Sequence, residues 1–235
     1  MANSPGRSEA GSSTVKYQGR KTSRAGSEQR RKLILEAALR IVVREGVRGI
    51  RHRAVAKEAD VPLAATTYYF KDIQELINDT FTLYAEQALE VVNQFSMKLY
   101  EPMEAAGGKS LAEALNEVNG PSSLVNVIVE AMSDYVVDQV IKHRDALVAE
   151  QAFRYEAILN KNLHKLGEVH KQALMRKIID LLTLIKSPHP EEDAAIVLSV
   201  INRVEYEGLL VEPEELDKDK IQRILRRQLE LMFLK

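Results

Sequence analysis

The residues best suited to binding chemistry lie between positions 50 and 71, where basic side chains come first and hydroxyl and phenol groups follow. Arg51, His52 and Arg53 precede the run 63–70, which is Leu-Ala-Ala-Thr-Thr-Tyr-Tyr-Phe and holds no acidic residue. Arginine makes charge-assisted hydrogen bonds to phosphate, and Ala and Thr side chains can contact base edges. This combination is typical of a surface that lies against nucleic acid.

Two short helices and a tight turn must hold these residues in place. The pattern predicts helices over 52–59 and 63–69. Asp60 tolerates the left-handed conformation that the turn needs, and Pro62 pre-sets φ for entry to the second helix. A helix-turn-helix of this kind places its second helix in a major groove.

The remaining sequence is also helical by its apolar spacing, with Gly46 ending the first helix and 187–190 (Ser-Pro-His-Pro) ending a later one. Helices are predicted over 27–45, 72–100, 111–118, 122–143, 144–161, 163–186, 191–210 and 214–234. No strand pattern competes. The fold class is therefore all-α, with an N-terminal three-helix helix-turn-helix domain at 28–72 and a helical ligand-binding and dimerisation domain at 73–235.

Charge is divided unevenly along the chain. Residues 1–60 hold 14 Lys and Arg against 6 Asp and Glu, a net +8, and the rest hold 19 against 28, a net −9. A basic front on an acidic body favours a polyanionic partner for the front alone.

Residues 1–27 are rich in Gly and Ser and carry scattered basic side chains. With almost no apolar anchor, this basic arm is expected to be disordered when free. It is either a solvated tail or an arm whose Arg20, Lys21 and Arg24 reach phosphates or a minor groove.

Composition excludes several other classes. The 235 residues include no cysteine, which rules out a disulfide scaffold, a Cys-ligated metal and a thiol nucleophile. No signal peptide and no transmembrane segment is legible, so an intracellular, cytoplasmic protein without a membrane partner is expected.

No catalytic grouping emerges from the remaining polar residues. The run 107–110 (Gly-Gly-Lys-Ser) lacks the strand and the first glycine of a phosphate-binding loop. His164 and His170 are six apart and do not share a helical face, and Glu205 and Glu207 splay apart on one helix. We therefore expect no enzyme activity, no metal site and no cofactor.

A partly apolar small-molecule site is expected between the middle helices. Its candidate lining residues are Tyr100, Met132, Tyr135, Phe153, Tyr155, Met175 and Tyr206. Each could instead be plain core, since helical spacing alone predicts burial. Glu150, Arg154, Asn126 and Asn202 could supply polar contacts or be solvated.

The order of a helix, a helix-turn-helix, a long connecting helix and a helical body resembles the TetR family of one-component transcriptional repressors. The match is sharpest over 28–77, where Val61-Pro62-Leu63 and Thr66-Thr67-Tyr68-Tyr69-Phe70 follow the family's turn-and-helix pattern. The chain departs from the common pattern in having Asp60 for Gly, Thr67 for Tyr, Tyr69 for His and Ile73 for Lys. Beyond about residue 100 the resemblance is one of architecture.

The resemblance implies roles for individual residues. Val61, Thr66 and Phe70 would face the small core. The residues that would contact DNA are Arg51, His52, Arg53, Leu63, Ala64, Ala65, Thr67, Tyr68, Tyr69 and Lys71. Tyr68 and Tyr69 could instead be core aromatics.

The expected function is therefore that of a ligand-responsive regulator, a repressor that binds a near-palindromic double-stranded DNA operator as a homodimer and is released by a small-molecule effector. The last two helices are expected to form the dimer, because their apolar stripes are wider than one small core needs. The alternative is a helical protein-interaction or adaptor module with an incidental helix-turn-helix.

Overall fold

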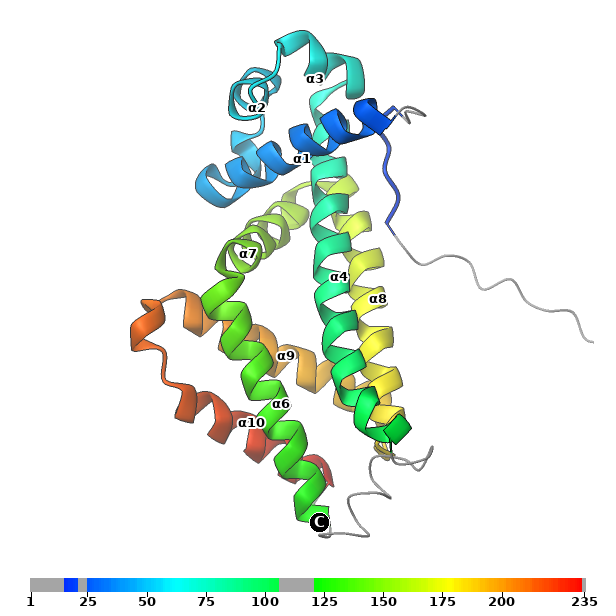
Figure 1. Ribbon diagram of the computed structural model, residues 1–235, viewed down its shortest axis with the longest axis vertical. Coiled ribbons are helices and arrows are strands. Elements are labelled where there is room, and N and C mark those ends of the chain that lie inside the picture. Colours follow the sequence, from blue (N-terminus) through cyan, green and yellow to red (C-terminus); the bar gives the residue numbers. More distant parts are fainter. Residues whose placement is uncertain (1–14, 21–24, 106–120, 234–235) are drawn as a thin grey trace, which may run out of the picture.

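The computed structural model describes residues 15–20, 25–105 and 121–233; residues 15–20 are extended or bent, and the other two parts are mostly helical without any strand (Figure 1). The helices are α1 (Ala25–Glu45), α2 (His52–Glu58), α3 (Leu63–Tyr69), α4 (Ile73–Ala105), α6 (Pro121–Lys142), α7 (Arg144–Leu159), α8 (Lys161–Leu184), α9 (Pro190–Leu209) and α10 (Lys218–Phe233), with 3₁₀ turns η1 (Val47–Gly49) and η2 (Pro213–Glu215). The all-α fold class is confirmed. The predicted helix 111–118 lies outside the described residues.

The observed helix ends differ from the predicted ones by a few residues. Helix α4 continues to Ala105 rather than ending at 100, and α10 begins at Lys218 rather than 214. Pro213 starts the 3₁₀ turn η2 instead, and the Asp217 carboxylate then accepts a hydrogen bond from the Lys220 backbone N–H at 2.8 Å. An aspartate in this position caps the first turn, so the helix begins there.

The predicted turn chemistry is present around the two short helices. Gly46 ends α1 with φ 74°, and Asp60 sits between α2 and α3 with φ 51°. Asp72 accepts a hydrogen bond from the Glu75 N–H at 2.9 Å, and the Glu75 carboxylate accepts one from the Lys71 N–H. This reciprocal capping starts α4.

Two hydrophobic clusters hold the molecule together. The first joins α1, α2 and α3 to α4, α7 and α8, and it runs without a break from Ile34 and Phe70 to Phe81 and Phe153. The second joins α6, α9 and α10 around residues such as Val129 and Leu225. Helices α1, α2 and α3 therefore pack directly against α4, α7 and α8.

The arrangement places α1, α2 and α3 at one end of the long helix α4 (Figure 1). Helices α4 and α8 run side by side, and α6 packs along α10. No helix in the described residues is long and apolar enough to cross a membrane.

Candidate nucleic-acid interface and ligand cavity

The outer face of α3 is exposed, and the basic residues predicted to flank it are exposed too. Arg51 and Arg53 lie at the start of α2 with their side chains in solvent. The exposed residues on and beside α3 are Leu63, Ala64, Thr67, Tyr68 and Lys71. No acidic side chain occurs in α3. His52 and Ala65 are half-buried, so they contribute less to this face than predicted.

Tyr69 does not belong to this face, and the prediction that it contacts DNA is wrong. Its side chain is only 5% exposed, and its hydroxyl lies 2.9 Å from the Ser27 Oγ. Position 69 follows the buried Thr66 by three residues and so points to the same side of the helix. Tyr68 is 52% exposed and remains available outside, with the Tyr69 ring packed edge-on against it.

Residues 15–20 lie against the junction of α1, α3 and α4, contrary to the disordered arm expected there. The Asp79 carboxylate accepts hydrogen bonds from the backbone N–H groups of Gln18 and Gly19 at 2.6 Å and 2.8 Å. The Arg20 N–H donates to the Tyr69 carbonyl at 3.1 Å. These bonds attach the segment to both α4 and the end of α3.

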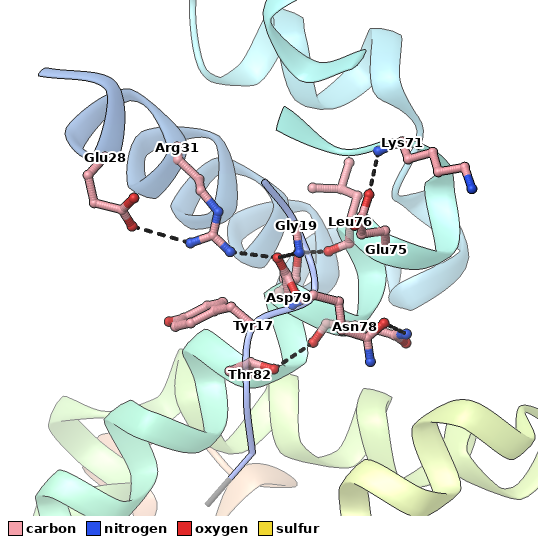
Figure 2. A network of polar contacts seen from close by, with 12 residues as sticks. Tyr17, Gly19, Glu28, Arg31, Lys71, Glu75, Leu76, Asn78, Asp79 and Thr82 are labelled. Carbon is pink, nitrogen blue, oxygen red and sulfur yellow. Dashed lines mark hydrogen bonds and ion pairs between the residues drawn. The ribbon is translucent and has the colours of Figure 1, made fainter. Parts of the chain in front are cut away.

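Arg31 completes the junction (Figure 2). Its Nη2 donates to Asp79 Oδ2 at 2.6 Å, and the two side chains are 5% and 0% exposed. The guanidinium also lies over the Tyr17 ring at 4.4 Å and near the Phe70 ring at 5.7 Å. We call the set Gln18, Gly19, Arg31 and Asp79 the junction clamp.

The segment 15–20 also adds a positive charge beside α3. The Arg20 guanidinium lies 4.5 Å from the centre of the Tyr68 ring. The aromatic ring attracts the cation, and the Arg20 side chain stays exposed. Arg20 therefore extends the exposed face of α3. Lys21 and Arg24 lie outside the described residues.

A second set of contacts joins the N-terminal helices to the body through α7. Arg48 Nε donates to Glu156 Oε2 at 3.2 Å, and α1 packs against both α7 and α4. At the end of α7, Asn160 Nδ2 donates to Gln74 Oε1 of α4 at 3.0 Å. Both α4 and α7 thus touch the N-terminal helices directly.

A cavity of about 420 Å³ lies among α4, α6, α7, α8 and α9. Its wall is mostly aliphatic and aromatic. Met132 and Tyr135 line it as predicted, as do Glu150 and Asn202. The cavity falls within the size range of small-molecule sites.

Other candidate lining residues lie elsewhere. Tyr155 is 64% exposed and Tyr206 is 49% exposed, so both point outward. Phe153 is fully buried in the core, with its ring 5.2 Å from that of Phe81. Met175 is half-buried outside the cavity wall. The side chain of Tyr100 is not among those described.

Sequence reasoning missed several groups that do line the cavity, among them Tyr84, Phe95 and Glu205. Tyr84 and Phe95 occupy the predicted helix 72–100, whose apolar stripe gave a usable signal. Glu205 gave none, because a carboxylate inside a helix is normally solvated. The predicted splay of Glu205 and Glu207 is present: Glu205 is 5% exposed, and Glu207 pairs with Arg203 and Lys220 at the surface.

Burial sets the ionisation of the acids in the cavity wall. The pKa of Glu205 is raised to about 8, mainly by burial and then by the nearby Glu150 charge, while Arg154 opposes the rise. The pKa of Glu150 is also raised by burial, although Arg154 and the Tyr84 hydroxyl counter this. Burial likewise raises the pKa of Tyr84 and of Tyr135 well above the usual value. Removing a carboxylate from water disfavours its charged form, so Glu205 is largely protonated at pH 7.

No family model matches the chain. A 77-residue stretch, 33% of this chain and 38% of the relative, is 32% identical to the HTH-type transcriptional regulator PksA of Bacillus subtilis. The chain therefore matches well under half of that curated relative.

Solved structures match along nearly the whole chain. A TetR-family member from Streptomyces coelicolor is 21% identical with a TM-score of 0.62, covering 85% of this chain and 98% of its own. A TetR regulator from Haloarcula marismortui is 13% identical with a TM-score of 0.64 over 87% of this chain and 98% of its own. The chain has the TetR-family fold. The multidrug-binding protein EbrR, in complex with ethidium, is 24% identical with a TM-score of 0.51, covering 85% of this chain and 98% of its own.

Proposed function

We propose that this TetR-fold chain is a DNA-binding transcriptional regulator, a repressor that reads a near-palindromic operator through α3 and is released by a small molecule in the cavity. The observation that carries the proposal is the exposed, acid-free face of α3, flanked by Arg51, Arg53 and Arg20. Arginines at the edge of such a helix bind phosphates, while Thr67 and Tyr68 reach the groove. PksA, which shares 32% identity over 77 residues, is named as a transcriptional regulator. We expect the chain to act in the cytoplasm.

A homodimer would supply the two reading helices that a palindrome needs. The outer face of α9 supports this part of the proposal, because Ile196, Tyr206 and Leu210 are exposed on one side of the helix. Leu231 is exposed on α10. Pairing these faces with those of a second copy would bury them in a four-helix interface. Sedimentation as a monomer at all concentrations would contradict it.

Ligand release would act through α4 and α7. Tyr84 lines the cavity only five residues after Asp79 of the junction clamp, on one continuous helix. On α7, Glu150 lines the cavity and Glu156 holds Arg48. A ligand that displaces either helix would change the separation between the two copies of α3 in the dimer. By linkage, DNA would weaken ligand binding by the same factor, with a coupling of ~1–3 kcal/mol typical of such systems.

The experiment is a duplex-binding titration at several salt concentrations. Arg51→Ala and Arg53→Ala should each weaken binding and reduce the slope of log K against log salt by about one unit per lost phosphate contact. Lys177→Ala, which removes an exposed cation on α8, is the matched control and should leave the slope unchanged. An unchanged slope in both arginine variants, or equal affinity for unrelated duplexes, would contradict the proposal.

A further inference from the structure

The cavity combines an apolar wall with one buried carboxyl group that has no partner. Glu205 is 5% exposed, lines the cavity, and makes no hydrogen bond or ion pair among the described residues. A buried polar group normally finds a partner, because leaving it without one costs free energy. An acid that faces the cavity without a partner from the protein is a natural contact for a bound molecule.

The second acid in the wall is already satisfied. The Glu150 carboxylate pairs with Arg154 at 3.5 Å, and the Tyr84 hydroxyl also favours its charged form. Glu150 therefore does not need a ligand, although its negative charge reaches Glu205. The Glu150 carboxylate makes the potential in this part of the cavity negative, and Glu205 adds to it once it loses its proton.

Aromatic rings complete the surroundings. Phe95 and Tyr135 both line the cavity, with their ring centres 4.8 Å apart, and Tyr84 lines it from α4. The faces of aromatic rings attract cations, and quaternary ammonium groups are bound in this way. Among the described residues that line the cavity there is no lysine or arginine, so this part of the wall offers an acidic ligand no permanent positive charge.

We infer that the cavity binds an apolar molecule bearing a single positive charge, with Glu205 as the counter-ion and the aromatic wall around the charged group. The inference rests on the proposed function only in naming this cavity as the effector site. Neutral ligands of the same shape would fill the apolar part but leave Glu205 without a partner, and anions would be repelled by Glu150.

Binding of a positively charged ligand should be accompanied by release of a proton from the protein. Because burial raises the pKa of Glu205 to about 8, the acid is mostly protonated at pH 7, and a cation beside it would favour the carboxylate. Binding would then release close to one proton per cation. The other titratable groups in the cavity wall are Glu150 on α7, Tyr84 on α4, Tyr135 on α6, and His143. Arg154, on α7 outside the wall, acts on Glu205 through its charge.

The test is isothermal titration of the full-length, DNA-free protein at pH 7 with three probes. Ethidium and tetraphenylphosphonium are permanent cations, so any proton exchanged comes from the protein. Tetraphenylborate has the same shape as tetraphenylphosphonium and the opposite charge. Titrating in two buffers that differ in ionisation enthalpy gives the number of protons released.

Wild type should bind at least one of the two cations more tightly than the anion and release about one proton per cation at pH 7. Glu205→Gln should lower affinity for that cation roughly ten- to a hundredfold and abolish the proton release. Glu207→Gln, an exposed carboxylate two residues away on the same helix, should change neither quantity. A circular dichroism melt confirms that each variant is folded.

The opposite results would overturn the inference. These are failure of both cations to bind, anion binding as tight as cation binding, or a proton release that persists in folded Glu205→Gln. A parallel duplex titration with tetraphenylphosphonium keeps the two proposals apart, since this probe does not intercalate as ethidium does. Cation binding without any sequence-dependent duplex binding would support the inferred ligand class and refute the proposed regulator. Sequence-dependent duplex binding without cation binding would support the regulator and refute the ligand class.

Discussion

Two buried carboxyl groups of this molecule differ sharply in what surrounds them. Asp79 at the junction is 0% exposed and accepts hydrogen bonds from Gln18, Gly19 and the Arg31 guanidinium (Figure 2). Glu205 in the cavity is 5% exposed and has no hydrogen-bond partner in the described part of the chain. Burial is nearly the same at both sites.

The difference shows that burial alone does not decide what an acid does. A buried charge that is paired and hydrogen-bonded holds its neighbours in one arrangement, and removing its partner leaves an uncompensated charge. A buried acid without a partner avoids that cost by taking up a proton. The first arrangement suits a structural clamp, and the second suits a site that a ligand completes.

The largest effect should follow from breaking the clamp. Asp79→Asn removes the negative charge beside the buried Arg31, and breaking a buried pair in this way costs about 3–5 kcal/mol. Urea denaturation should show a free energy of unfolding lower by that amount. Asp138→Asn removes a surface partner of Lys142 and should change stability by less than about 1 kcal/mol. Equal effects at the two sites would refute the clamp.

Glu205→Gln should have the opposite effect on stability. The folded-state pKa of Glu205 is raised to about 8 from an ordinary value of 4.5, so its contribution is fully present below pH 4.5 and is lost as pH rises toward 8. Gln has no proton to lose. The variant should therefore be more stable than wild type by roughly 2–4 kcal/mol at pH 8 and nearly equal to it at pH 4.5.

His170 should lower the stability of wild type and Glu205→Gln equally at acid pH. Burial lowers the pKa of His170 to about 4, so stability falls in wild type and variant alike as pH drops below the ordinary value of 6.5. Thermal melts of wild type and Glu205→Gln from pH 4.5 to pH 8 would separate the effect of Glu205 from that of His170. A difference between wild type and Glu205→Gln that does not grow with pH would refute the assignment at Glu205.

A smaller effect is expected at Gly19, which tests the backbone half of the clamp. A Cβ added there would lie 2.7 Å from Asp79 Oδ2 and 3.1 Å from the Phe70 ring. The segment 15–20 must shift, so Gly19→Ala should lower the free energy of unfolding by about 1–3 kcal/mol. Gly26→Ala is the matched control, because nothing lies within 4 Å of its added Cβ.

The smallest effect should come from Tyr17→Phe. This change removes the hydroxyl that donates to Glu86 but keeps the ring under Arg31. Because Glu86 lies in solvent, the free energy of unfolding should fall by about 1 kcal/mol or less. A loss of unfolding free energy as large as that of Asp79→Asn would show that the Tyr17 hydroxyl, rather than the Asp79 carboxylate, contributes most to the clamp.

Much of the fold could be predicted from sequence because helix ends have local signals. Gly46 and Asp60 adopt the left-handed conformations that their residue types allow, and Asp72 caps α4. The exposed face of α3 followed from the order of Thr66, Thr67 and Tyr68 along one helix. These features depend on residues close together in the chain.

Features made by distant residues could not be predicted in the same way. The pairing of Asp79 with Gln18 and Gly19 spans about sixty positions, so the basic segment gave no sign that it would dock. The family resemblance places Tyr69 on the DNA face, and nothing local to α3 shows that its hydroxyl instead meets Ser27 in another helix. Glu205 is buried only because α9 packs into the body, and its own helix would otherwise leave it in solvent.

Glu205 is inferred to be a neutral acid in the free protein that becomes the counter-ion of a bound cation. Carbon-13 NMR of glutamate-labelled protein can follow its titration directly, with Glu205→Gln to assign the signal. The Glu205 carboxyl carbon should titrate with a midpoint near pH 8 in the free protein, in keeping with its raised pKa of about 8, and the midpoint should fall when tetraphenylphosphonium is added. A midpoint close to the ordinary value of 4.5, or one that the cation leaves unmoved, would contradict the account.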